Sequence, residues 1–306
     1  MRLIKEEDSD VYLDVAEIVK MVKTEAEVNK ERAVIKEVSE KLKGRVGDSV
    51  EEYQRPMPSR AAVIKIVRMA NTLMFPSYYC PQTGRYNSIK ILRKLIRLLK
   101  EQISVGLGEE KNSKRGHELA LEVISEIPEI RRKLLDDVTA IYEGDPAASS
   151  RAEIILTYPG FWAISVYRLA HELYIKNIPL IPRIMSEFAH EKTGIDIHPG
   201  AKIGEYFCID HGTGIVIGES TEIGERVKIY QGVTLGARSI PHGDDGIACR
   251  GVKRHPKIGD RCTVYANATI LGGDTVIGSG SIIGANVWLT HSVPENSKIY
   301  YSSSEN

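Results

Sequence analysis

Three histidines are the side chains of this sequence best suited to chemistry. His198 lies in the run D-I-H-P, His211 in D-H-G-T-G and His255 in K-R-H-P. An imidazole titrates near neutral pH and can take the proton of a hydroxyl nucleophile. A neighbouring carboxylate fixes the tautomer of such a base and stabilises its protonated form. The three motifs therefore favour general base catalysis on a hydroxyl group.

Other interpretations of these histidines need weighing. A histidine at the corner of a β-structure is commonly a solvated or hydrogen-bonded surface residue, and His198, which precedes a proline, fits that description best. Three histidines could also bind zinc, which needs neutral imidazoles converging at about 2 Å. The fixed charge of Arg254 beside His255 opposes a divalent cation, so we expect no metal.

A six-residue repeat must position these residues. Side chains that are aliphatic except for Thr221 recur every six positions from Ile197 to Val233, and a second, apolar row runs from Ile258 to Trp288, with glycines between them. This period is typical of a parallel β-helix, in which each side of a triangular coil takes one hexapeptide. Aliphatic residues stack inside, one coil or about 18 residues apart, and polar residues stay at the corners. Because Asp196 precedes His211 by 15 residues, we expect the two near the same side.

The six-residue phase is interrupted once, between Val233 and Ile258. Residues 237–254 have no repeat and contain His242, the pair Asp244-Asp245 and several glycines. We interpret this segment as an extended loop outside the prism, and long loops on a rigid scaffold are often functional.

The residues before the repeat have helical periodicity instead. In 88–105 one face is apolar, while lysines and arginines cover the rest. That basic side is most simply a solvated helix surface, with nucleic-acid contact as the alternative. A second helical stretch, 118–142, is expected to break at Pro128. The sequence thus predicts an α+β protein, with an all-helical domain over 1–193 and a β-helix domain over 194–306.

Composition limits the possible partners and location. Lysine plus arginine and aspartate plus glutamate both total 41, so a net charge of zero provides no field for nucleic acid or an anionic membrane. No apolar run approaches the roughly 20 residues that span a bilayer. Residues 1–10 are charged and lack a signal core, so we expect a cytoplasmic protein. The cysteines lack paired spacing and are expected to be free thiols: Cys80, Cys208, Cys249 and Cys262.

Four motifs in this order resemble the bacterial and plant serine acetyltransferases: D-P-A at 145–147, D-I-H-P at 196–199, D-H-G-T-G at 210–214 and R-H-P at 254–256. The helical run 160–174 and Q-G-V-T-L-G at 231–236 are also similar to that family. The resemblance covers about residues 135–290. It implies a left-handed parallel β-helix and transfer of acetyl from acetyl-CoA to the hydroxyl of L-serine, in cysteine biosynthesis.

The resemblance also implies roles for the matching positions. His211 would be the general base paired with Asp196, and His255 would assist at the substrate. The zwitterion of serine would be held by carboxylates on its ammonium and by a cation on its carboxylate: Asp145, Asp210 and Arg254. Acetyl-CoA would lie along the prism wall near small residues: Gly236, Ala237, Ala266 and Ala285. No metal or further cofactor is implied.

The family likeness extends to assembly and inhibition. Its site lies between neighbouring β-helices of a trimer, and most bacterial members join two trimers, so we expect a homotrimer or a dimer of trimers. L-cysteine, a near-isostere of serine, is a typical competitive inhibitor. Members that bind cysteine synthase use a C-terminal isoleucine, and this sequence ends in Asn306, so the likeness does not support that complex. The loop 237–254 is longer than the family pattern, and the region before about residue 130 matches it poorly.

Two alternatives keep the same fold. An acetyltransferase acting on a sugar or antibiotic hydroxyl would not need Asp145, Asp210 and Arg254. A non-catalytic trimeric scaffold would hold His211 in a packed interface with no cleft beside it.

Overall fold

A computed structural model describes residues 25–43, 56–80, 86–240, 242–243 and 246–301. By its internal contacts the chain forms two compact units, residues 1–56 and 57–306, and each is described by itself. The described part of the first unit is one helix, α2 (Glu25–Lys43). The sequence favours helix over residues 11–42, and 11–24 lie outside the described residues.

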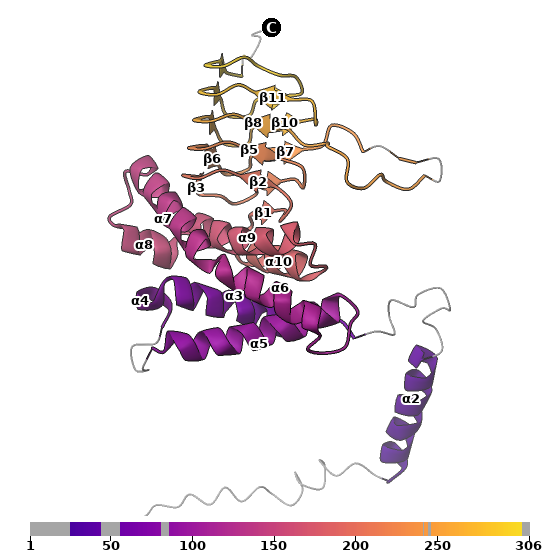
Figure 1. Ribbon diagram of the computed structural model, residues 1–306. Helices are drawn as coiled ribbons and strands as arrows, with labels where there is room; N and C mark the ends of the chain where they lie inside the picture. The colour runs from indigo at the N-terminus through magenta and orange to yellow at the C-terminus, as the bar shows by residue number, and fades with distance from the viewer. Residues whose placement is uncertain (1–24, 44–55, 81–85, 241, 244–245, 302–306) are drawn as a thin grey trace, which may run out of the picture. The chain divides into compact units, whose positions relative to one another are not determined.

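The second unit begins with a group of helices (Figure 1). Their bounds are α3 (Arg60–Met74), α4 (Pro76–Tyr79), α5 (Ser88–Gly106), α6 (Lys114–Ser125), α7 (Ile127–Gly144), α8 (Arg151–Thr157), α9 (Pro159–Ile175) and α10 (Ile181–Thr193). Polar N-caps begin several of them; Ser59, for example, accepts a hydrogen bond from the amide of Ala62. The break expected at Pro128 is confirmed, because this proline lies in the first turn of α7, where its missing amide costs nothing.

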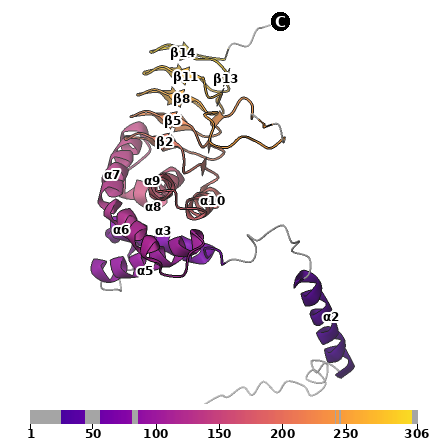
Figure 2. The same cartoon turned by 45° about the vertical axis from the view of Figure 1, so that its right-hand side comes forward.

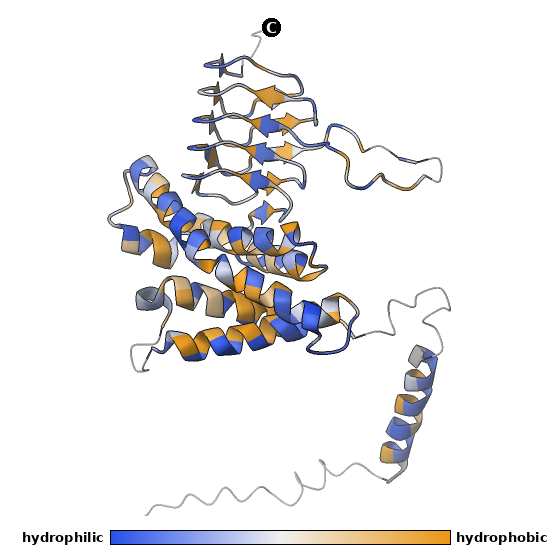
Figure 3. Ribbon diagram, in the orientation of Figure 1, coloured by the Kyte–Doolittle hydropathy of each residue, from blue (hydrophilic) through white to orange (hydrophobic). Residues whose placement is uncertain are grey.

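Helix α5 shows how the apolar stripe is used. Leu95 and Leu99 are buried, whereas Ile89 in the first turn is exposed. Figure 3 shows hydrophobic and hydrophilic residues alternating along this helix. The predicted apolar face therefore packs through its later turns. Among the described residues, no helix is long and apolar enough to cross a membrane, and all four cysteines are free thiols, as expected.

After α10 the chain winds into a parallel β-helix with three short strands per coil (Figures 1 and 2). The first sheet stacks β1 (Asp196–Ile197), β4 (Val216–Ile217), β7 (Thr234–Gly236), β10 (Thr269–Leu271) and β13 (Trp288–Leu289). The second stacks β2 (Lys202–Ile203), β5 (Glu222–Ile223), β8 (Lys257–Ile258) and β11 (Val276–Ile277). The third stacks β3 (Cys208–Asp210), β6 (Lys228–Tyr230), β9 (Thr263–Val264), β12 (Ile282–Ile283) and β14 (Lys298–Ile299). The predicted α+β fold is confirmed.

The first coil is longer than the sequence predicts. Ile197 pairs with Ile217, 20 residues later, instead of stacking one 18-residue coil away on Ile215. The added residues lie in the corner after β3, where His211, Gly212 and Gly214 all have positive φ. The expectation of an uninterrupted repeat up to Val233 was therefore wrong, and the added length is at the corner that carries the candidate base.

A second shift follows β10. Ile270 pairs with Leu289, 19 residues later, because a residue is added at the turn where Gly272 has φ +108°. Ile277 and Leu289 consequently point inward, whereas Val276 and Trp288, which the six-residue count places inside, are exposed by 41% and 69%. The sequence predicts one interruption of the repeat, at the loop 237–254, whereas the structure has three between Ile197 and Trp288: the corner after β3, that loop and the turn at Gly272.

The predicted loop 237–254 leaves the prism between β7 and β8 (Figures 1 and 2). Its described tip is drawn together by an antiparallel bridge between His242 and Ala248. Pro241 and the pair Asp244-Asp245 lie outside the described residues.

A buried ion pair joins the helices to the first coil. Arg168 of α9 donates from Nε and Nη2 to the two carboxylate oxygens of Asp137 on α7, at 2.5 and 2.7 Å. Arg168 also donates to the carbonyl of Gly204, and Asp137 accepts from the amide of Phe207. The pair therefore holds α7 and α9 against the turn between β2 and β3.

Candidate active site

His211 stands at the corner that follows β3. Its backbone is left-handed, with φ 57°, and 73% of its side chain is exposed. Nε2 of His211 lies 3.8 Å from Oδ1 of Asp210. An exposed imidazole on a rigid corner, with a carboxylate beside it, is positioned to accept a proton from a bound hydroxyl.

Asp145 supplies a second carboxylate at the end of α7. Its Oδ1 accepts from the amide of Ala147 at 2.9 Å, and its Oδ2 accepts from the hydroxyl of Tyr158 at 2.7 Å. The Tyr158 hydrogen bond, with that amide, lowers the pKa of Asp145, while the same bond raises the pKa of Tyr158 to about 12. Asp145 therefore stays a carboxylate that can accept a substrate cation.

Lys228 on β6 completes this first group of side chains, which we call the His211 cluster: Asp145, Tyr158, Asp210, His211 and Lys228. Its Nζ lies 2.8 Å from Oδ2 of Asp210 and donates to the carbonyl of Gly144 at 2.6 Å. The sequence analysis missed both Lys228 and Tyr158. A usable signal existed for the lysine, because Lys228 and Asp210 flank the buried Ile229 and Ile209 and so share the outer face of the third sheet.

A second group lies where the loop rejoins the prism. Nη2 of Arg254 lies 2.6 Å from Oε2 of Glu219, whose Oε1 accepts from the hydroxyl of Tyr174 on α9 at 2.9 Å. Burial raises the pKa of Glu219, but the hydrogen bonds from Tyr174 and Arg254 outweigh it and the net direction is down. Glu219 and Tyr174, which sequence reasoning missed, thus fix the guanidinium of Arg254.

His255 is buried beside Arg254. Its Nδ1 accepts from the amide of Ser220 at 3.1 Å, which assigns the proton of the neutral ring to Nε2. Burial, with the charge of Arg254, lowers the pKa of His255 to about 4. A Cβ at Gly218 would lie 2.0 Å from Cδ2 of His255, so the ring needs that glycine. His255 is therefore a neutral hydrogen-bond donor rather than a base.

The two groups lie on different edges of the prism. His211 lies between β3 and β4, on the edge joining the third sheet to the first. Arg254 and His255 lie between β7 and β8, on the edge joining the first sheet to the second, as do Glu219 and His198 in earlier coils. Within one chain the first sheet separates the candidate base from the candidate guanidinium.

His198 behaves as a structural residue. Its Nδ1 accepts from the amide of Gly200 at 3.0 Å, and its ring packs edge-on against Tyr174. Burial lowers its pKa, so the ring is neutral. These contacts agree with the sequence-based interpretation.

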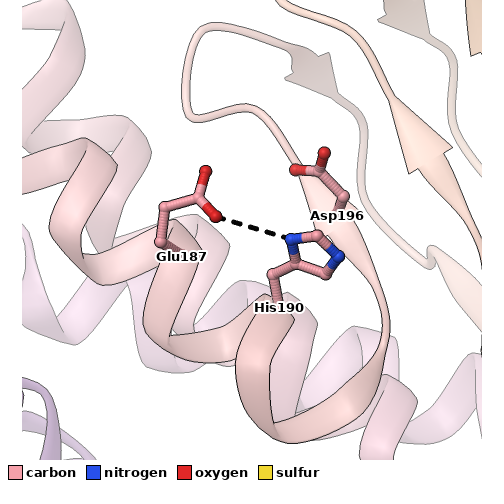
Figure 4. A group of neighbouring side chains, drawn as sticks. All are labelled: Glu187, His190 and Asp196. Carbon is pink, nitrogen blue, oxygen red and sulfur yellow. Dashed lines mark ion pairs between the residues drawn. The ribbon is translucent and has the colours of Figure 1, made fainter.

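Asp196 has neighbours other than the expected one. Figure 4 shows its carboxylate above the ring of His190. Nδ1 of that ring lies 3.5 Å from Oε2 of Glu187, and ligand atoms of the three residues lie within 4.8 Å of one another. Arg183 pairs with Glu187, and its charge opposes a metal ion at this surface position. Among the described residues no ion pair joins Asp196 to His211. The amide of Asp196 donates to the carbonyl of Ile215, and the amide of Gly214 donates to the carbonyl of Gly194, so β1 is joined to the end of the corner that carries His211. The predicted pairing of Asp196 with His211 stays a prediction.

The positions expected along acetyl-CoA border the first sheet. Ala266 and Ala285 lie in equivalent turns on the edge that carries His211, linked by the hydrogen bond from Asn286 to the carbonyl of Ala266. Gly236 ends β7, and Ala237 follows it at the opposite end of the same sheet. Ala285 is exposed, whereas Gly236, Ala237 and Ala266 are half-buried, and their contact with acetyl-CoA stays a prediction.

Comparison with known proteins places the chain. It is 46% identical over 261 residues to "Serine acetyltransferase, plasmid" of Synechococcus elongatus, covering 80% of this chain and 82% of that one. The chain belongs to the serine acetyltransferase family. The model of that family's N-terminal region matches residues 83–166 of this serine acetyltransferase. A Bacillus licheniformis serine acetyltransferase is 46% identical over 168 residues, or 55% of this chain and 73% of that one.

Solved structures agree with this assignment. Serine acetyltransferase 1 of Entamoeba histolytica in complex with L-cysteine matches with a TM-score of 0.70 and 38% identity, over 77% of this chain and 86% of that one. The soybean enzyme complexed with serine matches with a TM-score of 0.55 and 30% identity, over 80% and 98%. The predictions of family, fold and acyltransferase activity are confirmed.

Proposed function

We propose that this serine acetyltransferase transfers acetyl from acetyl-CoA to L-serine with His211 as the general base. The observation that carries the assignment is the His211 cluster, which sets an exposed imidazole 3.8 Å from Asp210 and within electrostatic reach of Asp145. L-serine is a zwitterion, so its recognition needs carboxylates for the ammonium and a cation for the carboxylate. Asp145 and Asp210 serve the first need and Arg254 the second.

The reaction runs by direct transfer. His211 takes the proton of the serine hydroxyl as its oxygen attacks the thioester carbonyl, and the new C–O bond forms as the oxyanion develops. The C–S bond then breaks, and the thiol leaves with the proton returned by His211. Asp196 orients the imidazole in its protonated form, and Nε2–H of His255 donates a hydrogen bond at the substrate. Acetyl-CoA lies along the wall by Ala237, Ala266 and Ala285.

A complete site needs two chains in this proposal. The base and the guanidinium lie on different edges of one prism, so His211 of one chain works with Arg254 and His255 of a neighbour. A homotrimer, or a dimer of trimers, brings such edges together. Exposed Val216 and Trp288 on the first sheet support a contact between prisms. L-cysteine, which has the same ammonium and carboxylate, would compete with serine at this site. For the location of the enzyme in the cell we propose the cytoplasm.

The direct test is thiol release from acetyl-CoA by the full chain with a panel of acceptors. The panel contains L-serine, L-threonine, a hexose and an aminoglycoside, and each reaction product is checked for the O-acetyl ester by mass spectrometry. Release with L-serine and not with the hexose supports the proposal. Thiol release only with the hexose or the aminoglycoside would favour an acetyltransferase that acts on a sugar or antibiotic hydroxyl. No thiol release with any acceptor would favour a non-catalytic trimeric scaffold.

A further inference from the structure

Lys228 places a resident ammonium group inside the His211 cluster. Its side chain is 18% exposed, and that of its partner Asp210 is 14% exposed. The ammonium lies 2.8 Å from Oδ2 of Asp210 and over the ring of Tyr230, 4.6 Å from its centroid. A charge pair so shielded from water interacts more strongly than one at the surface.

The two oxygens of Asp210 are consequently used differently. Oδ2 faces Lys228, whereas Oδ1 faces His211 at 3.8 Å. Among the described residues Asp145 forms no direct ion pair: its oxygens accept from Tyr158 and the amide of Ala147, and the charges of Lys228 and His211 are weaker causes of its lowered pKa. The cluster therefore holds two carboxylates, of which Asp210 is paired directly with Lys228 and Asp145 feels that charge only from a greater distance.

Lys228 also reaches the element that carries Asp145. Its Nζ donates to the carbonyl of Gly144, the last residue of α7, where the partial negative charge of a helix C-terminus favours a cation. Asp145 is the next residue. A hollow of about 200 Å³, lined by Gly144, Tyr206 and Cys208, opens beside the lysine.

We propose that Lys228 is a specificity-determining residue that occupies one oxygen of Asp210 and thereby weakens the hold of the site on the α-ammonium group of its substrate. The inference rests on the proposed function. A fixed cation beside Asp210 reduces the attraction of the pair of carboxylates for a second cation. The ammonium of L-serine is then held chiefly by Asp145, and an amino acid is released more readily than two free carboxylates would allow.

The test replaces the charge and keeps the hydrogen bond. Lys228→Gln retains a donor for the carbonyl of Gly144, and we expect its KM for L-serine to fall about threefold to tenfold with kcat within about threefold of the parent. Lys228→Arg, which retains the charge, should keep the parent KM. The matched control is Lys298→Met, because Lys298 on β14 occupies the same register row of the third sheet and is exposed.

An inhibitor without an amino group separates the effect of Lys228 on the substrate ammonium from its effect on the rest of the site. 3-Hydroxypropionate is L-serine without its amino group, and its inhibition constant against L-serine should be the same in the parent and Lys228→Gln. An unchanged or higher KM for L-serine in Lys228→Gln, or an equal change for both compounds, would overturn the proposal. Lys228→Met is measured in the same way, so that poor folding of one variant does not decide the result. A parent enzyme inactive on L-serine would instead refute the proposed function.

Discussion

The side chain of Arg254 is oriented by contacts that lead to helix α9, about 80 residues earlier in the sequence. Tyr174 of α9 donates to Glu219, and Glu219 pairs with Arg254, so the orientation of the guanidinium depends on these two residues. We expect Glu219→Gln to raise KM for L-serine about tenfold, which corresponds to the low end of the about 1.5–3 kcal/mol that a hydrogen bond to a charged group contributes. Tyr174→Phe should raise it only about threefold, because Tyr174 acts on Arg254 through Glu219, and kcat should change little in both. Steady-state kinetics with varied L-serine measures this. Tyr86→Phe, an exposed tyrosine, is the control, and equal KM values in all four proteins would contradict the account.

His255 makes stability depend on pH in a defined window. Its pKa is about 4 in the folded chain, against 6.5 for an ordinary imidazole. As pH falls from about 6.5 to 4 the unfolded chain binds a proton that the folded chain does not, so the free energy of unfolding falls through that window. In His255→Asn this loss between pH 7 and 4.5 should be smaller by roughly 1–2 kcal/mol.

Urea unfolding at the two pH values, at one protein concentration, measures the difference. His117→Asn on α6 is the control, since that ring is exposed. Parallel losses of stability in the parent and His255→Asn would show that His255 is not buried in its neutral form.

The sequence predicted the motif residues of the site better than the residues that hydrogen-bond to them. His211, Arg254 and His255 lie at corners, and Asp210 ends β3 next to one, which are places where the six-residue repeat leaves polar side chains facing outward. Tyr158 and Glu219 escaped it, because their roles arise from contacts between segments 13 to 35 residues apart that no local pattern records. The relation of Asp196 to His211 depends on side-chain direction at an irregular corner, which a period cannot give.

At the scale of elements, the strands were predictable and the coil lengths were not. Ile215 and Ile217 are both buried, because alternate residues of a strand share a face. A corner with two added residues therefore moves the aliphatic row from one member of the pair to the other without leaving a visible gap. The added residue at Gly272 is concealed in the same way, since Val276 and Ile277 are both aliphatic.

The ion pair between α7 and α9 gives a test at this scale. Arg168→Met leaves Asp137, whose side chain is fully buried, without its cation, and breaking a buried pair costs about 3–5 kcal/mol. We expect a lower Tm by calorimetry, with partial recovery in Arg168→Met/Asp137→Leu. Arg183→Met is the matched control, because Arg183 pairs with Glu187 at the exposed surface of α10 and such pairs contribute at most about 1 kcal/mol. Equal Tm changes for the two arginines would contradict this role.

For the whole molecule, the positions of the two edges predict an assembly of more than one chain, and the family likeness makes that assembly a trimer or a dimer of trimers. We expect light scattering after size exclusion to give a mass that is a multiple of three chains. Trp288→Glu should lower that mass by adding a charge to the exposed apolar side chain of β13. An active protein that remains monomeric at assay concentrations would show that one chain carries a complete site. The sequence could predict a trimer only through its family likeness, because a repeat specifies a prism and not the neighbour against which it packs.

General base catalysis by His211, which takes the proton of the serine hydroxyl, is the step on which the proposed activity depends most. The most direct measurement compares kcat for acetyl-CoA and L-serine in the parent, His211→Ala and His117→Ala, with the melting temperature of each protein as a check on folding. We predict that His211→Ala folds normally and loses about 10²- to 10⁴-fold in kcat, as removal of a positioned base does, while His117→Ala keeps the parent rate. Turnover by folded His211→Ala within a few-fold of the parent would contradict the account.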